Sequence, residues 1–308
     1  MTDTSPSDPD REQRFAEVLG EALQHAAKEP VLLARLEEYF SPKPAQLAET
    51  SEEESRLNAQ IERVVQVYGG APRLIIHVPN EPKPMYDMYM NSALIEVTAM
   101  FHRARRSVCR AQTFMIGAHM AGSTHDLLAP EVNEEIRSAI QRSANAAFWE
   151  HIETSFIRIA SFWDRVGQVL DFCFFSIRQY ERDGFSAVMD RIHANVLRMN
   201  PDYSVYEPWQ ELWNYKRSER EDGLQWLLSR RNLLVHSLHL RPLTSDETDE
   251  MFESAFNHID SRLKRNLATG TPLKELERVH AHLNRAAQLF PQVLRLCEHH
   301  ANRDRAFG

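Results

Sequence analysis

Residues 148–177 read FWEHIETSFIRIASFWDRVGQVLDFCFFSI, and this stretch decides the fold class. Large apolar side chains recur in it every three or four residues, which is the repeat of an α-helix and not of a β-strand. The residues in this repeat are Phe148, Ile152, Phe156, Ile159, Trp163, Val166, Leu170, Phe174 and Ile177. No proline occurs between residues 131 and 200, and Gly167 and Gly184 are the only glycines there. The pattern predicts one very long helix, or two in series with a bend near Gly167, ending at Arg182-Asp183-Gly184.

The sequence on either side predicts further helices joined by short connections. They span about residues 12–40 with a break at Pro30, 51–69, 86 onward, 186–199, 210–240 with a kink near Gly223, 245–267 and 272–300. Arg73 to Val78, a run with β-branched residues between two prolines, is the one convincing strand candidate. Long helices with short turns pack as antiparallel bundles. We therefore expect an all-α chain: a helical bundle over 91–300, a helical region with at most one short strand over 11–90, a disordered tail at 1–10 and a C-terminal tail at 301–308.

The overall charge argues against one class of protein. The 308 residues carry a formal net charge of −8, which disfavours a protein that coats nucleic acid without specificity. One segment departs from this balance, because no Asp or Glu occurs from Val97 to His125 while four arginines cluster there. These are Arg103, Arg105, Arg106 and Arg110. This helix face either grips a short stretch of RNA or is a solvated surface balanced by acids elsewhere in the fold.

The cysteines and the apolar runs bear on cellular location. Three cysteines lie far apart in the sequence, each among apolar neighbours, which favours reduced core residues over a disulfide framework. No apolar run is long enough to cross a bilayer, and the first 14 residues lack the basic and apolar regions of a secretory signal. We expect a cytoplasmic protein that does not contact membranes.

The segment from Leu224 to Leu238 holds the pattern most indicative of chemistry. An apolar stripe at helical spacing runs through Leu224, Leu227, Leu228, Leu234 and Leu238, and Arg231 falls on the same line. A guanidinium on a core-facing line is costly unless it meets a carboxylate, a phosphate or solvent. Ser229, Asn232 and His236 form a polar strip beside it, because they are spaced by three and four residues.

These side chains suit attack on an RNA phosphodiester. His236 titrates near neutrality, so it can accept the proton of a ribose 2′-hydroxyl or supply one to the departing 5′-oxygen. Arg231 offers two forked hydrogen bonds to the extra negative charge of the transition state. Asn232 can hold the imidazole or a phosphate oxygen in place. The reaction requires no metal ion or other cofactor, and no His–acid cluster has the spacing of zinc or magnesium ligands.

The motif Arg-Asn-x3-His within a helix resembles the signature of the HEPN family, with Arg231, Asn232 and His236 in its three positions. Arg-x4-His alone is expected about once by chance in a chain of this composition, and it recurs at Arg295 and His300. The adjoining Asn and the helical context make the first instance more specific. The resemblance covers about 15 residues of sequence and, by helix order alone, about residues 131–300.

The resemblance implies a ribonuclease of the kind found in toxin–antitoxin, abortive-infection and CRISPR systems. It also implies a homodimer with two motifs facing one cleft, and metal-independent cleavage that leaves a 2′,3′-cyclic phosphate. An antitoxin or other regulatory partner is a further implication. Some HEPN toxins carry a Tyr two residues after the His as the target of an antitoxin enzyme, but Leu238 stands here, which weakens that form of control.

Other interpretations of the same residues stay open. Arg231 and His236 are separated by about 140° on a regular helix, so one copy does not easily direct both at a single phosphate, whereas two copies related by a twofold axis do. Arg231 can instead be a structural residue paired with Glu153, Asp164 or Asp171, with His236 in the core. Candidate RNA contacts outside the motif are Arg230, His239, Arg103 and Arg106. The alternative to an enzyme is an inactive HEPN-like dimer that binds nucleotides or a protein.

Overall fold

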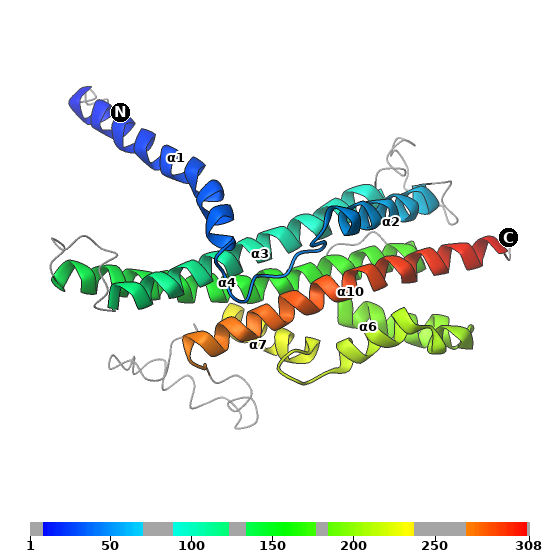
Figure 1. Ribbon diagram of the computed structural model, residues 1–308. Coiled ribbons are helices and arrows are strands. Elements are labelled where there is room, and N and C mark those ends of the chain that lie inside the picture. The colour runs from blue at the N-terminus through cyan, green and yellow to red at the C-terminus, as the bar shows by residue number, and fades with distance from the viewer. Residues whose placement is uncertain (1–8, 70–88, 123–133, 177–183, 237–268, 307–308) are drawn as a thin grey trace, which may run out of the picture. The chain divides into compact units, whose positions relative to one another are not determined.

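The computed structural model describes residues 9–69, 89–122, 134–176, 184–236 and 269–306 (Figure 1). In these ranges every regular element is a helix, which confirms the predicted all-α class. In chain order the elements are α1 (Pro9–Glu37), α2 (Ser51–Gly69), α3 (Tyr89–Gly122), α4 (Glu134–Phe175), α5 (Phe185–Ile192), the π-helix η2 (His193–Leu197), the 3-10 helix η3 (Pro201–Val205), α6 (Glu207–Arg217), α7 (Leu224–His236) and α10 (Pro272–Ala306). The predicted strand at 73–78 and the predicted helix at 245–267 lie outside the described residues.

The chain divides into two compact units, residues 1–43 and residues 44–308. The first unit contains α1, a continuous helix of 29 residues. The predicted break at Pro30 is wrong, since the helix runs through this residue to Glu37. A proline inside a helix removes one backbone hydrogen bond and crowds the preceding turn, and a long helix absorbs this by bending. The second unit contains all the other elements, so α2 packs together with the helices of residues 91–300.

Helix α4 is the centre of the second unit and runs unbroken for 42 residues. Its apolar side chains point in several directions because α3, α5, α7 and α10 all pack against it. Contacts between α3 and α4 pair Phe101 with Phe162 and Phe114 with His151, so the two helices are antiparallel. Of the two predicted forms of this region, the single long helix is therefore correct, although it ends at Phe175.

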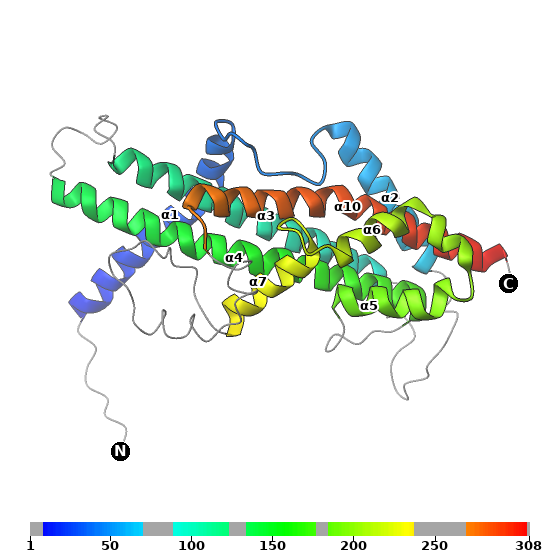
Figure 2. The same ribbon diagram turned by 90° about the horizontal axis from the view of Figure 1, so that it is seen from below.

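Helix α10 lies along α4 and runs in the same direction. The ring contacts between the two helices pair residue 156 with 282, 162 with 290 and 174 with 300, so both numbers rise together. Figures 1 and 2 show α3, α4 and α10 extending side by side along the length of this unit, with α5, α6 and α7 as shorter helices beside them. Helix α2 packs on α10, where the hydroxyl of Tyr68 donates to the carbonyl of Cys297 at 2.9 Å.

The predicted helix over 210–240 is in fact two helices. Helix α6 ends at Arg217 and α7 begins at Leu224, and a tight turn joins them. The amide of Gly223 donates to the carbonyl of Arg220 at 2.8 Å, and a Cβ at Gly223 would collide with Ser218. Glycine is needed at position 223 because the backbone and side chain of Ser218 lie so close to it. The turn sets the direction in which α7 leaves α6.

Two further expectations from the sequence bear on the described residues. Cys109, Cys173 and Cys297 are buried in the core and are not joined in disulfides, as predicted. None of the described helices combines the length and the apolar character that crossing a bilayer requires.

Candidate functional site

Helix α7 carries the Arg-Asn-x3-His motif and packs on α4. Its fully buried or nearly buried side chains are Leu224, Trp226, Leu227, Arg230 and Leu233. The buried arginine of this helix is thus Arg230, and the prediction that Arg231 lies on the core-facing line is wrong. Arg231 is partly exposed and Asn232 is exposed. The reason is that Trp226 joins the buried face, which rotates the core-facing line by about 100°, one residue around the helix.

Arg230 is held in the core by an ion pair with α10. Its Nη2 lies 2.7 Å from Oε2 of Glu275, and both side chains are 0% exposed. The guanidinium also lies over the rings of Phe156 and Trp226, at 5.5 and 5.3 Å from their centroids. Burial lowers the pKa of Arg230, and the charge of Glu275 opposes this shift. Arg230 was a candidate RNA contact, but its charge is enclosed in the bundle, away from any surface that RNA can reach.

The carboxylate of Glu275 is the centre of a larger buried network. Its Oε1 accepts hydrogen bonds from the amide of Gly270 at 2.8 Å and from Nη1 of Arg278 at 2.5 Å. Arg278 continues the network to Glu221, in the turn before α7, at 2.9 Å. A buried charge is tolerated only when several hydrogen bonds compensate it. The network therefore fixes the start of α7, its middle and α10 to one another.

Arg231 and Asn232 lie next to each other at the surface of α7. Nη1 of Arg231 donates a hydrogen bond of 3.1 Å to Oδ1 of Asn232. On the α4 side stands Asp164, whose pKa is raised by burial, while the positive charges of Arg231 and Arg165 oppose the rise. Of the three acids considered as partners of Arg231, Asp164 is thus the one that is close, since Asp171 pairs with Arg191 at 2.5 Å and Glu153 faces Arg230.

His236 is the last residue of α7 and follows Asn232 by one helical turn. Its side chain lies outside the described part of the chain, as do His239 and the rest of 237–268. The described site thus consists of a cation, an amide and a half-buried carboxylate, with His236 placed by its backbone position.

Arg103 and Arg106, the other candidate RNA contacts, are exposed on α3. The guanidinium of Arg158 on α4 reaches between them, with Nη1 donating to the carbonyl of Arg103 at 3.1 Å and to the hydroxyl of Ser107 at 2.6 Å. Burial lowers the pKa of Arg158, and so do the charges of Arg110, Arg103 and Arg106. No local pattern in the sequence points to Arg158, because only the antiparallel packing of α3 on α4 brings residue 158 to residue 103.

The described residues contain two buried histidines, both on α10. Burial lowers the pKa of His280 to about 4 and that of His282 to about 4, so both are neutral at physiological pH. Nε2 of His280 lies 3.2 Å from Oε1 of Gln112, and His282 stacks on Trp226. No three His, Cys, Asp or Glu side chains within the described ranges are arranged to hold a metal ion.

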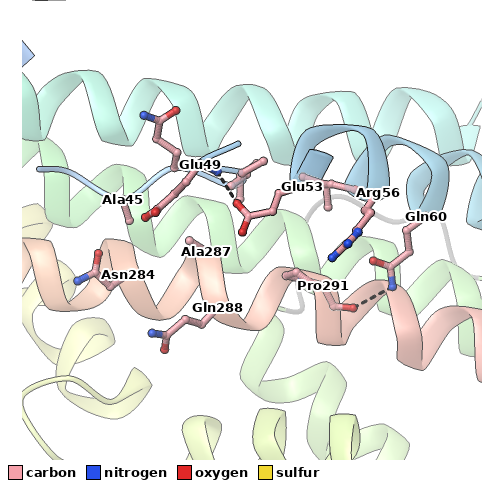
Figure 3. Close-up of a pocket in the computed structure, with 13 residues that line it drawn as sticks. Ala45, Glu49, Glu53, Arg56, Gln60, Asn284, Ala287, Gln288 and Pro291 are labelled. Carbon is pink, nitrogen blue, oxygen red and sulfur yellow. Dashed lines mark hydrogen bonds between the residues drawn. The ribbon is translucent and has the colours of Figure 1, made fainter. Parts of the chain in front are cut away.

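A groove of about 570 Å³ lies elsewhere, between residues 45–49, α2 and α10 (Figure 3). Polar side chains in this groove form hydrogen bonds with nearby backbone groups. Oε2 of Glu53 accepts from the amides of Glu49 and Thr50 at 2.8 and 3.3 Å, which caps the start of α2. Nε2 of Gln60 donates to the carbonyl of Pro291 at 3.3 Å. We assign these groups to capping and packing and not to chemistry.

Comparison of the chain with protein-family models, with curated proteins and with solved structures gave no match. The candidate site therefore depends on the motif and on the geometry described above.

Proposed function

We propose that the protein is a metal-independent endoribonuclease of the HEPN type whose reacting groups are Arg231, Asn232 and His236. One observation carries the proposal: Arg231 and Asn232 are hydrogen-bonded to each other on the solvent side of α7. The adjacent Arg230 supplies the buried ion pair that anchors the helix, which leaves Arg231 available to a ligand. A purely structural arginine would be expected in the position that Arg230 takes.

The proposed reaction is an internal transesterification of RNA. The imidazole of His236 removes the proton of a ribose 2′-hydroxyl, and the 2′-oxygen attacks the adjacent phosphorus. The bond from phosphorus to the 5′-oxygen breaks, a 2′,3′-cyclic phosphate remains, and the 5′-oxygen leaves with a proton from a second imidazole in its imidazolium form. Arg231 stabilises the extra negative charge on the phosphorane oxygens, and Asn232 holds Arg231 in position.

A second copy of the chain supplies the second imidazole. Residues 231 and 236 are separated by about 140° around a regular helix, so one α7 presents them in different directions. Two α7 helices facing each other across a twofold axis place two arginines and two histidines around one phosphate. Such a ribonuclease fits a growth-arrest or phage-defence role, with an antitoxin or regulatory protein as partner.

The decisive experiment is cleavage of RNA in EDTA by the purified protein. We expect products that end in a 2′,3′-cyclic phosphate, detected by mass spectrometry. His236→Ala should reduce the rate by about 10² to 10⁴, the range for loss of a general acid or base. His119→Ala is the matched control, because His119 is exposed on α3 and outside the site. If RNA is bound but not cut, the protein is an inactive binding module, and equal rates for the two variants would exclude the site.

A further inference from the structure

The surface formed by α3 and α4 carries a group of four arginines from two helices: Arg103, Arg106, Arg110 and Arg158. We name it the α3–α4 arginine cluster. Three members lie on α3 at spacings of three and four residues, so they follow one face of that helix. The fourth, Arg158, is fixed between them by hydrogen bonds to the carbonyl of Arg103 and the hydroxyl of Ser107.

Acidic residues do little to neutralise three members of this cluster, Arg103, Arg106 and Arg158. Arg103 has a partner in Glu96, but their closest atoms are 3.6 Å apart and both side chains are substantially exposed, at 56% and 41%. Among the described residues, Arg106 and Arg158 form no ion pair with a carboxylate. Acidic side chains therefore do not balance the charges of Arg106 and Arg158 within the described ranges.

Like charges held together cost free energy unless an anion joins them. Arg158 is partly buried between two helices that pack along their whole length, so it cannot move away from its neighbours as a long exposed side chain would. Charged groups that stand on rigid helices are held in place more precisely than groups on loops, which suits a binding site. The cluster is thus prepared for an anionic ligand.

We propose that the α3–α4 arginine cluster binds the phosphodiester backbone of an RNA strand. Residues 103 to 110 span about 10 Å of helix, which allows the cluster to contact more than one phosphate of the same strand. All four cations are arginines, whose forked donors match phosphate oxygens better than lysines do. This proposal extends the proposed function, because it assigns the grip on the substrate to a surface distinct from the motif on α7.

The test measures binding without cleavage. The probe is a fluorescein-labelled 2′-O-methyl oligoribonucleotide of about 16 nucleotides, which keeps its phosphates and has no free 2′-hydroxyl to react. We expect the double variant Arg106→Gln/Arg158→Gln to raise Kd about tenfold in fluorescence anisotropy. The slope of log Kd against log salt should fall by about 1.4, since each lost phosphate contact on a single strand accounts for about 0.7.

The matched control is Arg285→Gln/Arg295→Gln. These arginines of α10 are 40% and 43% exposed and are paired with Asp222 and Glu207, so the same charge is removed from neutralised positions. Arg106→Gln alone serves as a second variant, because Arg106 makes none of the structural hydrogen bonds that Arg158 makes. Circular dichroism confirms that each variant is folded.

Equal Kd values for the cluster and control variants would overturn the proposal, as would binding to phosphatidylserine vesicles with none to the oligonucleotide. Failure of the proposed function gives a different result, since the unmodified RNA then stays intact while the cluster variants still weaken binding of the 2′-O-methyl probe.

Discussion

Arg230 and Glu275 form an ion pair of 2.7 Å in which both side chains are fully buried. Arg230 directly precedes Arg231, the arginine proposed to contact RNA. Adjacent arginines on one helix thus have opposite environments. Arg230 faces α10 and the aromatic core, whereas Arg231 is partly exposed and lies beside Asn232. Because the pair fixes the rotation of α7, it also determines which side chains that helix presents outward.

Removal of one partner of this pair should destabilise the fold severely. We expect Glu275→Ala to lower the free energy of unfolding by about 3–5 kcal/mol, since Arg230 would remain charged and buried. Urea denaturation provides the measurement. Glu277→Ala is the control, because Glu277 is 57% exposed and lies 3.9 Å from Lys274, and it should change stability by less than about 0.5 kcal/mol. Similar losses in the two variants would show that the buried pair has no special role.

The buried histidines predict a loss of stability in mild acid. In the folded state the pKa of His282 is about 4, below the value of about 6.5 in an unfolded chain. Between these values the unfolded state binds more protons, so the free energy of unfolding should fall by about 1 kcal/mol per pH unit for this residue as pH drops. His280 adds a similar dependence.

Urea denaturation between pH 7 and pH 4.5 measures this dependence. His282→Leu should make the curve of unfolding free energy against pH less steep, while the exposed control His119→Ala should leave its shape unchanged. A His282→Leu curve parallel to that of the wild type would contradict a neutral, buried His282.

Two glycines in long helices should respond to alanine in opposite directions. A Cβ on Gly167 of α4 would lie 2.6 Å from the backbone nitrogen of Phe185, so Gly167→Ala should separate α4 from α5 and cost about 1–3 kcal/mol. Gly117 on α3 has nothing within 4 Å of such an atom, and Gly117→Ala should stabilise the protein by about 0.5–1 kcal/mol through helix propensity. Thermal unfolding of both variants checks the signs, and a stabilising Gly167→Ala would be inconsistent with the close approach.

Mixed dimers test whether the proposed site is shared between chains. Arg231→Ala and His236→Ala are each expected to be inactive alone. Mixed after unfolding and refolding together, they should regain part of the activity, because a heterodimer contains one intact arginine and one intact histidine, and water can replace the second imidazole as the slower proton donor to the 5′-oxygen. Sedimentation should give twice the mass of the 35.7 kDa chain. Absence of any recovery, in a sample shown to contain heterodimers, would assign the whole site to a single chain.

Much of the helical framework could be predicted from the sequence, because local signals determine it. Ser51 with the three glutamates after it begins α2, Gly69 ends it, and Pro272 begins α10. These positions depend on backbone hydrogen bonding and on the helix dipole, which neighbouring residues control. The sequence predicts only a kink near Gly223, whereas the structure has a complete break between α6 and α7. The break depends on the close contact of Gly223 with Ser218, which a local sequence pattern does not reveal.

The details of the site were less predictable, because they depend on contacts between distant residues. The leucine spacing favoured Arg231 as the buried arginine, but Trp226 and a carboxylate 45 residues away select Arg230. The arginines of α3 are evident in the sequence. The fourth member of the α3–α4 arginine cluster, Arg158, lies on α4, 51 residues after its hydrogen-bond partner Ser107. The resemblance to HEPN proteins stays a prediction for the experiments above.

The antiparallel contact of α3 with α4 also bears on how the chain reaches its native state. These helices are neighbours in sequence, so little chain entropy is lost when they associate, while α10 must find α2, α3 and α4 across much longer separations. We expect the antiparallel pair of α3 and α4 to form the folding nucleus and α10 to pack against it late in folding. Core substitutions between α3 and α4 should then slow refolding, and those on α10 should mainly accelerate unfolding.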